Sequence, residues 1–211
     1  MKRALLADDH PIFRNGLKLI LTYEMDMYVA EATNGMEALE YLQNNTVDLV
    51  IIDIDLPGIN GLDVVRNIRK SRSAVPVLIM SALPADEYAE RAVKAGASGF
   101  LNKQADKLTF MGAIRSLFRE QQYKKEPVVQ GAEEETDGQQ DILPHKHLSD
   151  REYEVFCLLA SGKSVGEIAE KLHLSDKTVS THRTRLLKKM NLSTNADLTN
   201  YALKHELIRL V

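Results

Sequence analysis

The feature that most limits the fold of this 211-residue sequence is an alternation in its first 118 residues between short apolar runs and helical patterns. Between these runs, apolar residues recur at the three- and four-residue spacing of amphipathic helices. Five such strand–helix units predict an α/β domain with a doubly wound, five-stranded parallel sheet covered by helices on both faces. The apolar runs lie at residues 4–7, 28–32, 49–52, 77–80 and 99–101.

The residues of this domain that carry chemistry stand near the ends of the predicted strands. Asp8 and Asp9 follow the first strand, Asp53 the third and Ser81 the fourth, while Lys103 comes shortly after the fifth. The carboxyl ends of parallel strands share one edge of the sheet, so we expect these side chains to converge there. Clustered carboxylates repel one another unless a cation lies among them, and oxygen ligands suit Mg²⁺. A carboxylate beside such an ion is also a candidate nucleophile for phosphoryl transfer.

Each of these residues has an ordinary explanation when it is taken alone. Asp8 can cap a helix that begins at Pro11, because Asp is common at helix starts. Lys103 can be a solvated surface lysine and Ser81 a turn hydroxyl. Asp53 is harder to explain in this way, because a carboxylate directly after a four-residue apolar strand needs a partner. The prediction of a phosphoryl site therefore rests on the whole set.

In order and spacing, the set resembles the receiver domain of bacterial two-component response regulators, which has a flavodoxin-like fold. The chain departs from the usual family pattern in Asn102-Lys103-Gln104 and in the extra carboxylate of Asp55. The matching motifs are Asp8-Asp9-His10, Asp53 with Leu56-Pro57-Gly58 and Gly61, Ser81-Ala82, and Lys103.

The resemblance implies a role for each matching residue. Asp53 would accept a phosphoryl group from a sensor histidine kinase, and Ser81 and Lys103 would contact the phosphoryl oxygens. Phe100 occupies the place of the family's switch aromatic and would respond together with Ser81. Mg²⁺ would be held by Asp8, Asp9, Asp53 and the backbone carbonyl of Asp55.

Residues 148–211 have no strand-like alternation and instead show repeated helix-start signals. Ser149 with Glu152, and Ser164 with Glu167, have the spacing of capping boxes, and Ser175 is placed to cap a third helix. A fourth helical pattern covers residues 195–205. The second and third helices are separated only by a tight turn, which predicts a helix-turn-helix within a four-helix, all-α domain.

The third of these helices is strongly basic in a chain whose formal net charge is −3. A concentration of positive charge on one helix favours contact with nucleic-acid phosphates, and short hydroxyl side chains allow close approach to base edges. The basic residues are Lys177, Arg183, Arg185, Lys188 and Lys189, and the hydroxyl residues are Thr178, Ser180, Thr181 and Thr184.

The same region resembles the LuxR-type helix-turn-helix of the NarL/FixJ class of response regulators. The resemblance implies that Ser180, Thr181 and Thr184 face DNA bases. It also implies phosphate contacts from Lys177, Thr178, Arg183, Arg185 and Lys188. The matching residues are Leu148-Ser149, Arg151-Glu152, Gly162, Ser164, Glu167-Ile168-Ala169, Leu174-Ser175, Lys177-Thr178-Val179, His182 and Leu186.

Residues 119–147 separate a receiver domain, residues 1–118, from the helix-turn-helix domain, residues 148–211. They are polar, carry a net charge of −3 and lack apolar periodicity, so we predict a flexible linker. The single cysteine, Cys157, excludes an internal disulfide, and no apolar run approaches the length of a membrane span. The N-terminus lacks the pattern of a signal peptide, and we expect a cytoplasmic protein without a membrane contact.

We therefore predict a transcription factor whose sequence-specific binding to double-stranded promoter DNA is controlled by phosphorylation of Asp53. Its own chemistry would be limited to self-phosphorylation from a phosphodonor and slow autodephosphorylation, so it is not expected to be an enzyme. Phosphorylation would move Ser81 and Phe100. The altered surface would then release the DNA-binding domain, promote a homodimer, or do both. RNA polymerase is a further expected partner.

Two other classes of protein remain open from the sequence. Asp53-Ile54-Asp55 superficially matches the Asp-x-Asp of haloacid-dehalogenase-like phosphatases, although that family needs further catalytic segments. Alternatively, the chain could bind DNA constitutively and use its receiver-like domain only for dimerisation. Turnover of a phosphate ester would favour the first class, and DNA affinity independent of a phosphodonor would favour the second.

Overall fold

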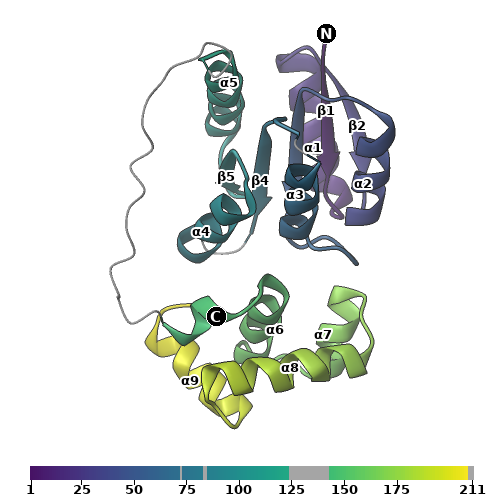
Figure 1. Cartoon of the computed structure of the whole chain (residues 1–211). Coiled ribbons are helices and arrows are strands. Elements are labelled where there is room, and N and C mark those ends of the chain that lie inside the picture. Colours follow the sequence, from purple (N-terminus) through teal and green to yellow (C-terminus); the bar gives the residue numbers. More distant parts are fainter. Residues whose placement is uncertain (72, 83–84, 124–142, 209–211) are drawn as a thin grey trace. The chain divides into compact units, whose positions relative to one another are not determined.

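The computed structural model describes residues 1–71, 73–82, 85–123 and 143–208. The chain divides into two compact units, Met1–Pro127 and Val128–Val211 (Figure 1). In the described part, no helix is both long enough and apolar enough to cross a membrane.

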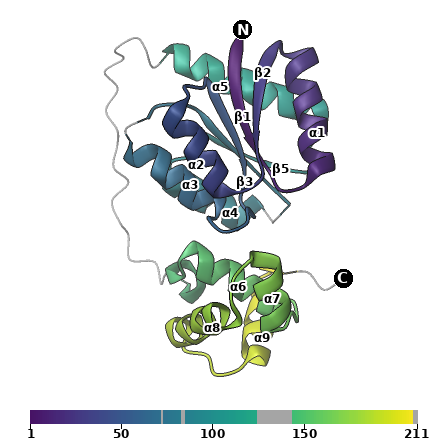
Figure 2. The same cartoon turned by 90° about the vertical axis from the view of Figure 1, so that its right-hand side faces the viewer.

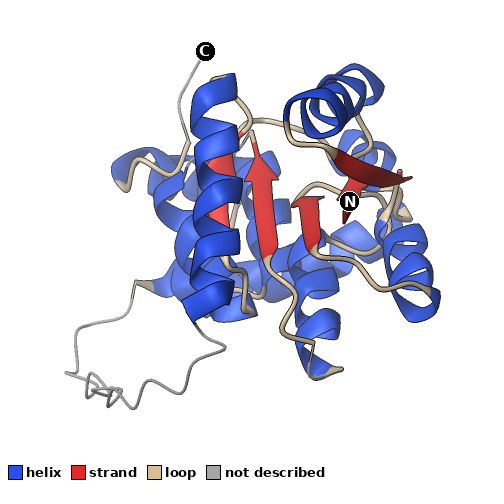
Figure 3. Cartoon of the chain, turned by 90° about the horizontal axis from the view of Figure 1, so that it is seen from above, coloured by secondary structure: helices blue, strands red, loops and turns tan. Residues whose placement is uncertain are grey.

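The first unit is built on a five-stranded parallel sheet, as predicted. Its spatial order is β2-β1-β3-β4-β5, so β2 lies on one side of β1 and the later strands follow one another on the other side. Figure 3 shows the strands in red among the helices. The third and fourth strands run slightly further than the apolar runs indicated, because Asp53 pairs with Met80 and Ser81 with Asn102. The strands are β1 (Lys2–Ala7), β2 (Met27–Ala32), β3 (Leu49–Asp53), β4 (Val77–Ser81) and β5 (Gly99–Asn102).

Helices cover both faces of this sheet (Figure 2). Helices α1 and α5 lie on one face, where their apolar side chains join a core cluster with alternate residues of the strands. Helices α2, α3 and α4 follow one another along the other face. The helices are α1 (Pro11–Leu19), α2 (Gly35–Asn44), α3 (Gly61–Lys70), α4 (Ala85–Ala95) and α5 (Lys107–Tyr123).

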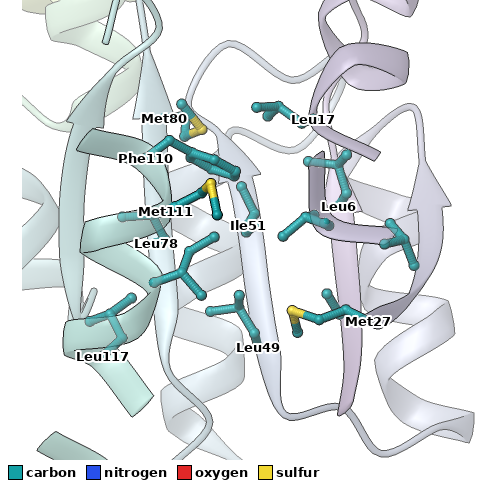
Figure 4. Close-up of a cluster of buried hydrophobic side chains, with 14 residues drawn as sticks. Leu6, Leu17, Met27, Leu49, Ile51, Leu78, Met80, Phe110, Met111 and Leu117 are labelled. Atoms are coloured by element: carbon teal, nitrogen blue, oxygen red, sulfur yellow. The ribbon is translucent and has the colours of Figure 1, made fainter. Parts of the chain in front are cut away.

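The core cluster between the sheet and α5 fixes the strands that carry the acidic residues. Leu49 and Ile51 of β3 face Phe110 and Leu117 of α5, and Leu6 of β1 lies beside them (Figure 4). Each fully buried side chain of this kind contributes about 1.5 to 3 kcal/mol relative to an exposed one. The residues of β3 and β4 are all buried, as expected for strands covered on both faces. The ends of these strands are therefore held rigidly.

One irregular turn in this unit was not predicted. Helix α1 continues into a π-helix, η1 (Ile20–Glu24), after which Asp26 adopts a positive φ of 51°. Leu21 within this turn is fully buried and belongs to the same core cluster as Leu17 of α1. The irregular turn thus keeps its apolar side chain on the core face while it redirects the chain toward β2.

In the part of the second unit that the structure describes, residues 143–208, four α-helices follow a short 3-10 helix. Both predicted capping boxes are present, and Ser175 caps the third helix through the backbone N–H of Thr178. Gly162 has a positive φ of 85° just after the first of these helices ends, a conformation in which glycine commonly terminates a helix. The elements are η2 (Pro144–His147), α6 (Asp150–Ala160), α7 (Val165–Leu172), α8 (Asp176–Met190) and α9 (Asn195–Lys204).

Both ends of the predicted linker, residues 119–147, belong to folded elements. Helix α5 continues to Tyr123, because the polar residues after Phe118 include good helix formers. At the other end, His145 of η2 is fully buried, and its Nδ1 lies 2.9 Å from the hydroxyl of Tyr201 in α9. The predicted flexibility of the remaining linker, residues 124–142, concerns a segment outside the described residues and stays a prediction.

Candidate phosphoryl and DNA-binding sites

The predicted acidic residues meet at the carboxyl edge of the sheet. Asp8 and Asp9 directly follow β1, and Asp53 is the last residue of the neighbouring strand β3. Asp8 and Asp53 are buried, with only 1% and 2% of their surface exposed. Ligand oxygens of these three residues lie within 4.8 Å of one another. The sequence-based expectation that strands far apart in the chain bring these carboxylates together is thus met.

Lys103 completes this cluster from the other side. Its Nζ lies 2.5 Å from Asp53 Oδ2 and 2.8 Å from Asp8 Oδ2. Its backbone N–H donates to the carbonyl of Ser81 at 2.9 Å, which ties the end of β5 to the end of β4. Burial alone would lower the pKa of Lys103, but the carboxylates of Asp53 and Asp8 outweigh burial and raise it. Lys103 therefore carries a positive charge directly beside Asp53.

The carboxyl group of Asp53 ionises less readily than an ordinary aspartate. Its pKa is raised from 3.8 to about 6, mainly because the group is buried. The positive charge of Lys103 opposes this rise, and the negative charges of Asp55 and Asp8 add to it. The backbone N–H of Asp55 donates to Asp53 Oδ1 at 3.2 Å. At neutral pH the group is ionised. Its negative charge destabilises the folded state unless a further cation binds among Asp8, Asp9, Asp53 and Lys103, which together form the phosphoryl pocket.

This cost predicts a pH effect on the metal-free protein. The pKa of Asp53 is higher in the folded state than in the unfolded state. Protonation of Asp53 therefore stabilises the fold fully below about pH 4, and this stabilisation is lost as the pH rises through about 6. The pKa shift corresponds to at most about 3 kcal/mol in the free energy of unfolding. The Asp53→Asn variant should therefore gain stability relative to wild type between pH 4.5 and 7.5 in the presence of EDTA.

Calorimetry of the full chain would measure this difference at both pH values. Saturating Mg²⁺ should narrow the gap at pH 7.5, because it supplies the missing positive charge to the wild type. A gap that stays constant between the two pH values would show that Asp53 is not the strained carboxylate.

The chemistry of the pocket fits a hard divalent cation. Asp9 Oδ1 is buried and receives no hydrogen bond of acceptable geometry from the described residues, although His10 Nδ1 lies 2.7 Å away. A buried carboxylate oxygen without a donor is a natural metal ligand. Together with Asp8 and Asp53 it forms the oxygen-rich set that Mg²⁺ prefers.

His10 was part of the recognised motif, but sequence reasoning gave it no role. Its Nδ1 lies 3.3 Å from Asp8 Oδ1 and 3.5 Å from Lys103 Nζ, so the largely exposed imidazole borders the acidic cluster. A second missed residue is Arg14, whose guanidinium donates to the backbone carbonyl of Asp8 at 2.7 Å. The signal for His10 was its position directly after the paired aspartates, whereas the contact of Arg14 depends on how α1 packs.

The remaining predicted residues occupy neighbouring positions. Ser81 is fully buried at the end of β4, in register with Asn102. Phe100 is half-buried in the middle of β5, opposite Ile79. Asp55 is half-buried two residues after Asp53. Ser81 and Phe100 thus lie on the paired strands β4 and β5, and their role as a switch stays a prediction.

The loop after Asp53 is closed by a residue that tolerates no side chain. Gly61 begins α3, and a Cβ added there would lie 2.0 Å from the backbone oxygen of Asp53. We expect Gly61→Ala to destabilise the receiver unit by about 2 kcal/mol or more, because the contact is with rigid backbone. Gly112→Ala in α5 is the matched control. It has no neighbour within 4 Å and should stabilise the helix by about 0.5 to 1 kcal/mol.

Thermal unfolding of both glycine variants would check this prediction. Equal midpoints for Gly61→Ala and wild type would show that the loop after Asp53 adapts at no cost.

The basic helix of the second unit presents its predicted DNA-binding residues on the solvent side. Val179, Leu186, Leu187 and Met190 are buried on its inner side, toward α6 and α7. The remaining two predicted contacts, Thr178 and Arg183, are half-buried. The exposed predicted residues are Lys177, Ser180, Thr181, Thr184, Arg185 and Lys188.

Two basic side chains of α8 are engaged by neighbouring helices. Lys189 Nζ lies 2.5 Å from Glu152 Oε2 of α6, a carboxylate that is only 5% exposed. Arg183 donates through Nε to Asn195 Oδ1, at the start of α9, at 2.8 Å. These contacts fix α8 on its neighbours, and they show that not every positive charge on the helix is equally available to a ligand.

Comparison with known families accounts for both units. Residues 4–115 match the model of the response regulator receiver domain, and residues 146–202 match that of the bacterial regulatory proteins of the luxR family. The protein called response regulator UvrY, from Escherichia coli K12, is 33% identical over 209 residues, which cover 98% of this chain and 96% of UvrY. The oxygen regulatory protein NreC of Staphylococcus epidermidis is 34% identical over 217 residues, covering 98% and 99%.

A solved structure shows the same fold along almost the whole length. RcsB from Salmonella enterica serovar Typhimurium, bound to the promoter rprA with the phosphomimetic BeF₃⁻, has a TM-score of 0.62. The match covers 95% of this chain and 98% of RcsB, at 22% sequence identity.

The chain belongs to the response regulators of two-component systems, with a receiver domain followed by a LuxR-type DNA-binding domain. The class predicted from sequence is thus confirmed, and Asp53-Ile54-Asp55 is part of a receiver domain rather than of a haloacid-dehalogenase-like phosphatase. The protein is a DNA-binding regulator rather than a classical enzyme. Its class implies a kinase partner for the receiver domain and DNA for the second domain.

Proposed function

We propose that phosphorylation of Asp53 by a sensor histidine kinase controls sequence-specific binding of this protein to promoter DNA. The observation that carries the proposal is the geometry around Asp53. This carboxylate is buried at the end of β3, contacted by Lys103 at 2.5 Å and close to Asp8 and Asp9.

The residues of the pocket support a simple transfer reaction. A carboxylate oxygen of Asp53 would attack the phosphorus atom of a phosphohistidine, forming a P–O bond as the P–N bond breaks. The leaving imidazole keeps the electron pair of that bond and takes up a proton. Lys103 and Ser81 would then contact the phosphoryl oxygens and stabilise their charge. A small phosphodonor could replace the kinase, and water attack on the acyl phosphate would reverse the modification slowly.

The metal ligands in this proposal are Asp8, Asp9, Asp53 and the backbone carbonyl of Asp55. Mg²⁺, when bound, neutralises part of the negative charge on the phosphoryl group. The buried Asp9 oxygen and the high pKa of Asp53 both support a cation here, because each marks negative charge that the described residues leave incompletely balanced.

The phosphoryl group would act through the ends of β4 and β5. Ser81 would move toward a phosphoryl oxygen, and Phe100 would shift into the space that Ser81 leaves. A ligand can change an equilibrium only through contacts that differ between two states, and these two residues supply such contacts. The altered surface would release the DNA-binding unit, promote a homodimer, or both.

On DNA, the proposal assigns base contacts to Ser180, Thr181 and Thr184. A homodimer would place two copies of α8 in successive major grooves, about 34 Å apart. Phosphate contacts are assigned to Lys177, Thr178, Arg183, Arg185 and Lys188.

Contact with RNA polymerase would follow at the promoter, and we expect the protein to work in the cytoplasm, where that DNA lies.

The test is a selection of bound fragments from random double-stranded DNA by the full chain, with and without acetyl phosphate and Mg²⁺. We expect one enriched sequence with two half-sites, bound at least about tenfold more tightly after phosphorylation, a coupling of ordinary size. Equal affinity in both states would instead support a constitutive DNA-binding protein whose receiver domain only dimerises.

A further inference from the structure

The solvent-facing side of α8 has an order that the roles proposed above leave unexplained. Lys177, Thr181, Thr184 and Lys188 follow one another at spacings of four, three and four residues, and all four are exposed. These spacings place side chains on one face of a helix. We call these four residues the α8 stripe. It has a lysine at each end and two threonines in the middle, and it spans about 16 Å along the helix axis.

The hydroxyl hydrogens of both threonines are used within the helix. Thr181 donates through its Oγ1 to the carbonyl of Lys177 at 2.8 Å, and Thr184 donates to the carbonyl of Ser180 at 3.0 Å. A hydroxyl group has a single hydrogen, so each of these oxygens can only accept a further hydrogen bond. Toward a ligand, Thr181 and Thr184 therefore present an acceptor oxygen and a methyl group.

The major groove of DNA offers distinct partners for these two groups. The amino groups of adenine N6 and cytosine N4 are donors, and thymine carries a methyl group. Guanine presents only the acceptors N7 and O6 there. Opposite a threonine oxygen, two acceptors would then face each other with no hydrogen between them to form a bond. The lysines at the ends of the α8 stripe have the opposite character, since an ammonium group only donates.

We infer that Thr181 and Thr184 read the operator as hydrogen-bond acceptors. The middle of each half-site then carries an adenine or cytosine amino group opposite each threonine oxygen, with thymine methyl groups against the threonine methyls. Guanine is disfavoured at these two contacts. This inference rests on the proposed function, because it specifies what the DNA-binding face of α8 recognises.

The size of the effect follows from one hydrogen bond per contact. Removal of one amino group from the DNA should weaken binding about 3- to 10-fold, the range expected for a single neutral hydrogen bond at an interface. The phosphate contacts of the lysines remain, so binding is weakened but not lost.

The experiment uses the full chain, phosphorylated with acetyl phosphate, and the DNA fragment that it selects. In each half-site, single adenines are replaced by a purine without the N6 amino group, and single cytosines by a pyrimidinone without the N4 amino group. For the wild type we expect a 3- to 10-fold loss at one position for each threonine. Thr184→Val has the same shape without the oxygen. It should therefore bind natural DNA as weakly as the wild type binds the analogue DNA, and it should lose no further affinity when the base opposite residue 184 lacks its amino group.

Thr184→Ser is the matched control, because it keeps the oxygen and its bond to the Ser180 carbonyl but loses the methyl group. It should remain sensitive to removal of the amino group and become insensitive to replacement of the neighbouring thymine by uracil. Thr184 is exposed, and equal unfolding midpoints would verify that both variants are folded.

Two results would overturn the inference while leaving the proposed function intact. One is an unchanged loss at every analogue position in both Thr184→Val and Thr181→Val. The other is a guanine whose replacement by 7-deazaguanine weakens binding of the wild type but not of Thr181→Val or Thr184→Val, since that result makes the replaced threonine a donor. If no fragment is selected in either phosphorylation state, the proposed function itself fails, and the inference fails with it.

Discussion

We expect the Asp53→Asn protein to take up no phosphoryl group from acetyl phosphate and Mg²⁺, under conditions in which the wild type is labelled. An amide of the same size cannot supply the anionic oxygen that attacks phosphorus. Lys103 contacts Asp53 at 2.5 Å, and Asp53 lies among the other acidic residues, so positive charge from Lys103 and from a bound cation can stabilise a phosphoryl group on this carboxylate. Intact-mass measurement of the full chain would detect the added phosphoryl group.

Asp55→Asn is the matched control for this prediction. Asp55 is a second carboxylate two residues away and half-buried, but only its backbone carbonyl is assigned to the metal. This variant should still be labelled, although at a changed rate, because the pKa of Asp53 falls when a neighbouring negative charge is removed. A labelled Asp53→Asn protein, or an Asp55→Asn protein that is never labelled, would move the acceptor away from Asp53.

Much of the receiver fold was accessible from sequence because its strands β3 and β4 are buried on both faces. A strand of this kind is a continuous apolar run, as in residues 77–80, and the helices between strands have a clear apolar spacing. The π-helix at Ile20–Glu24 could not be predicted in this way, since its apolar residues also suit an ordinary helical turn. The extension of α5 to Tyr123 was missed because residues without apolar periodicity can still continue a helix that has already formed.

In the candidate site, too, some contacts follow from the topology of the strands and others depend on how side chains pack. Parallel topology brings the ends of neighbouring strands to one edge, so Asp8 and Asp53 could be placed together without any side-chain information. The contact of Lys103 with both carboxylates required the recognised family pattern in addition. The imidazole of His10 and the contact of Arg14 with the Asp8 carbonyl depend on rotamers and on the packing of α1, which no sequence period encodes.

The basic helix shows a further limit of sequence reasoning. From charge alone, Lys188 and Lys189 are equally good candidates for contact with DNA phosphates, but the structure places them in different environments. Lys188 is exposed on the outer face, whereas Lys189 forms an ion pair with Glu152 of the first capping box. Because the two residues are adjacent and chemically identical, they provide a direct test of which charges reach DNA.

The second large effect is expected when exposed positive charges of α8 are removed together. In the triple variant Lys177→Gln, Arg185→Gln and Lys188→Gln, each substitution removes one proposed phosphate contact and the counterion release that accompanies it. The slope of log affinity against log salt should fall by about 0.9 for each contact, and so by about 2.7 in total. At about 0.15 M salt this corresponds to a loss of affinity of the order of a hundredfold.

Lys189→Gln is the control that separates phosphate binding from net charge. It removes the same unit of charge from the next position, but its expected cost is stability, about 1 to 3 kcal/mol, because the buried Glu152 loses its cation. Its salt slope should match that of the wild type, while that of Lys188→Gln alone should be lower by about 0.9. Titration of the selected fragment at several salt concentrations measures both slopes. If the two single variants lose the same slope, DNA responds to the overall charge of α8 and not to its outer face.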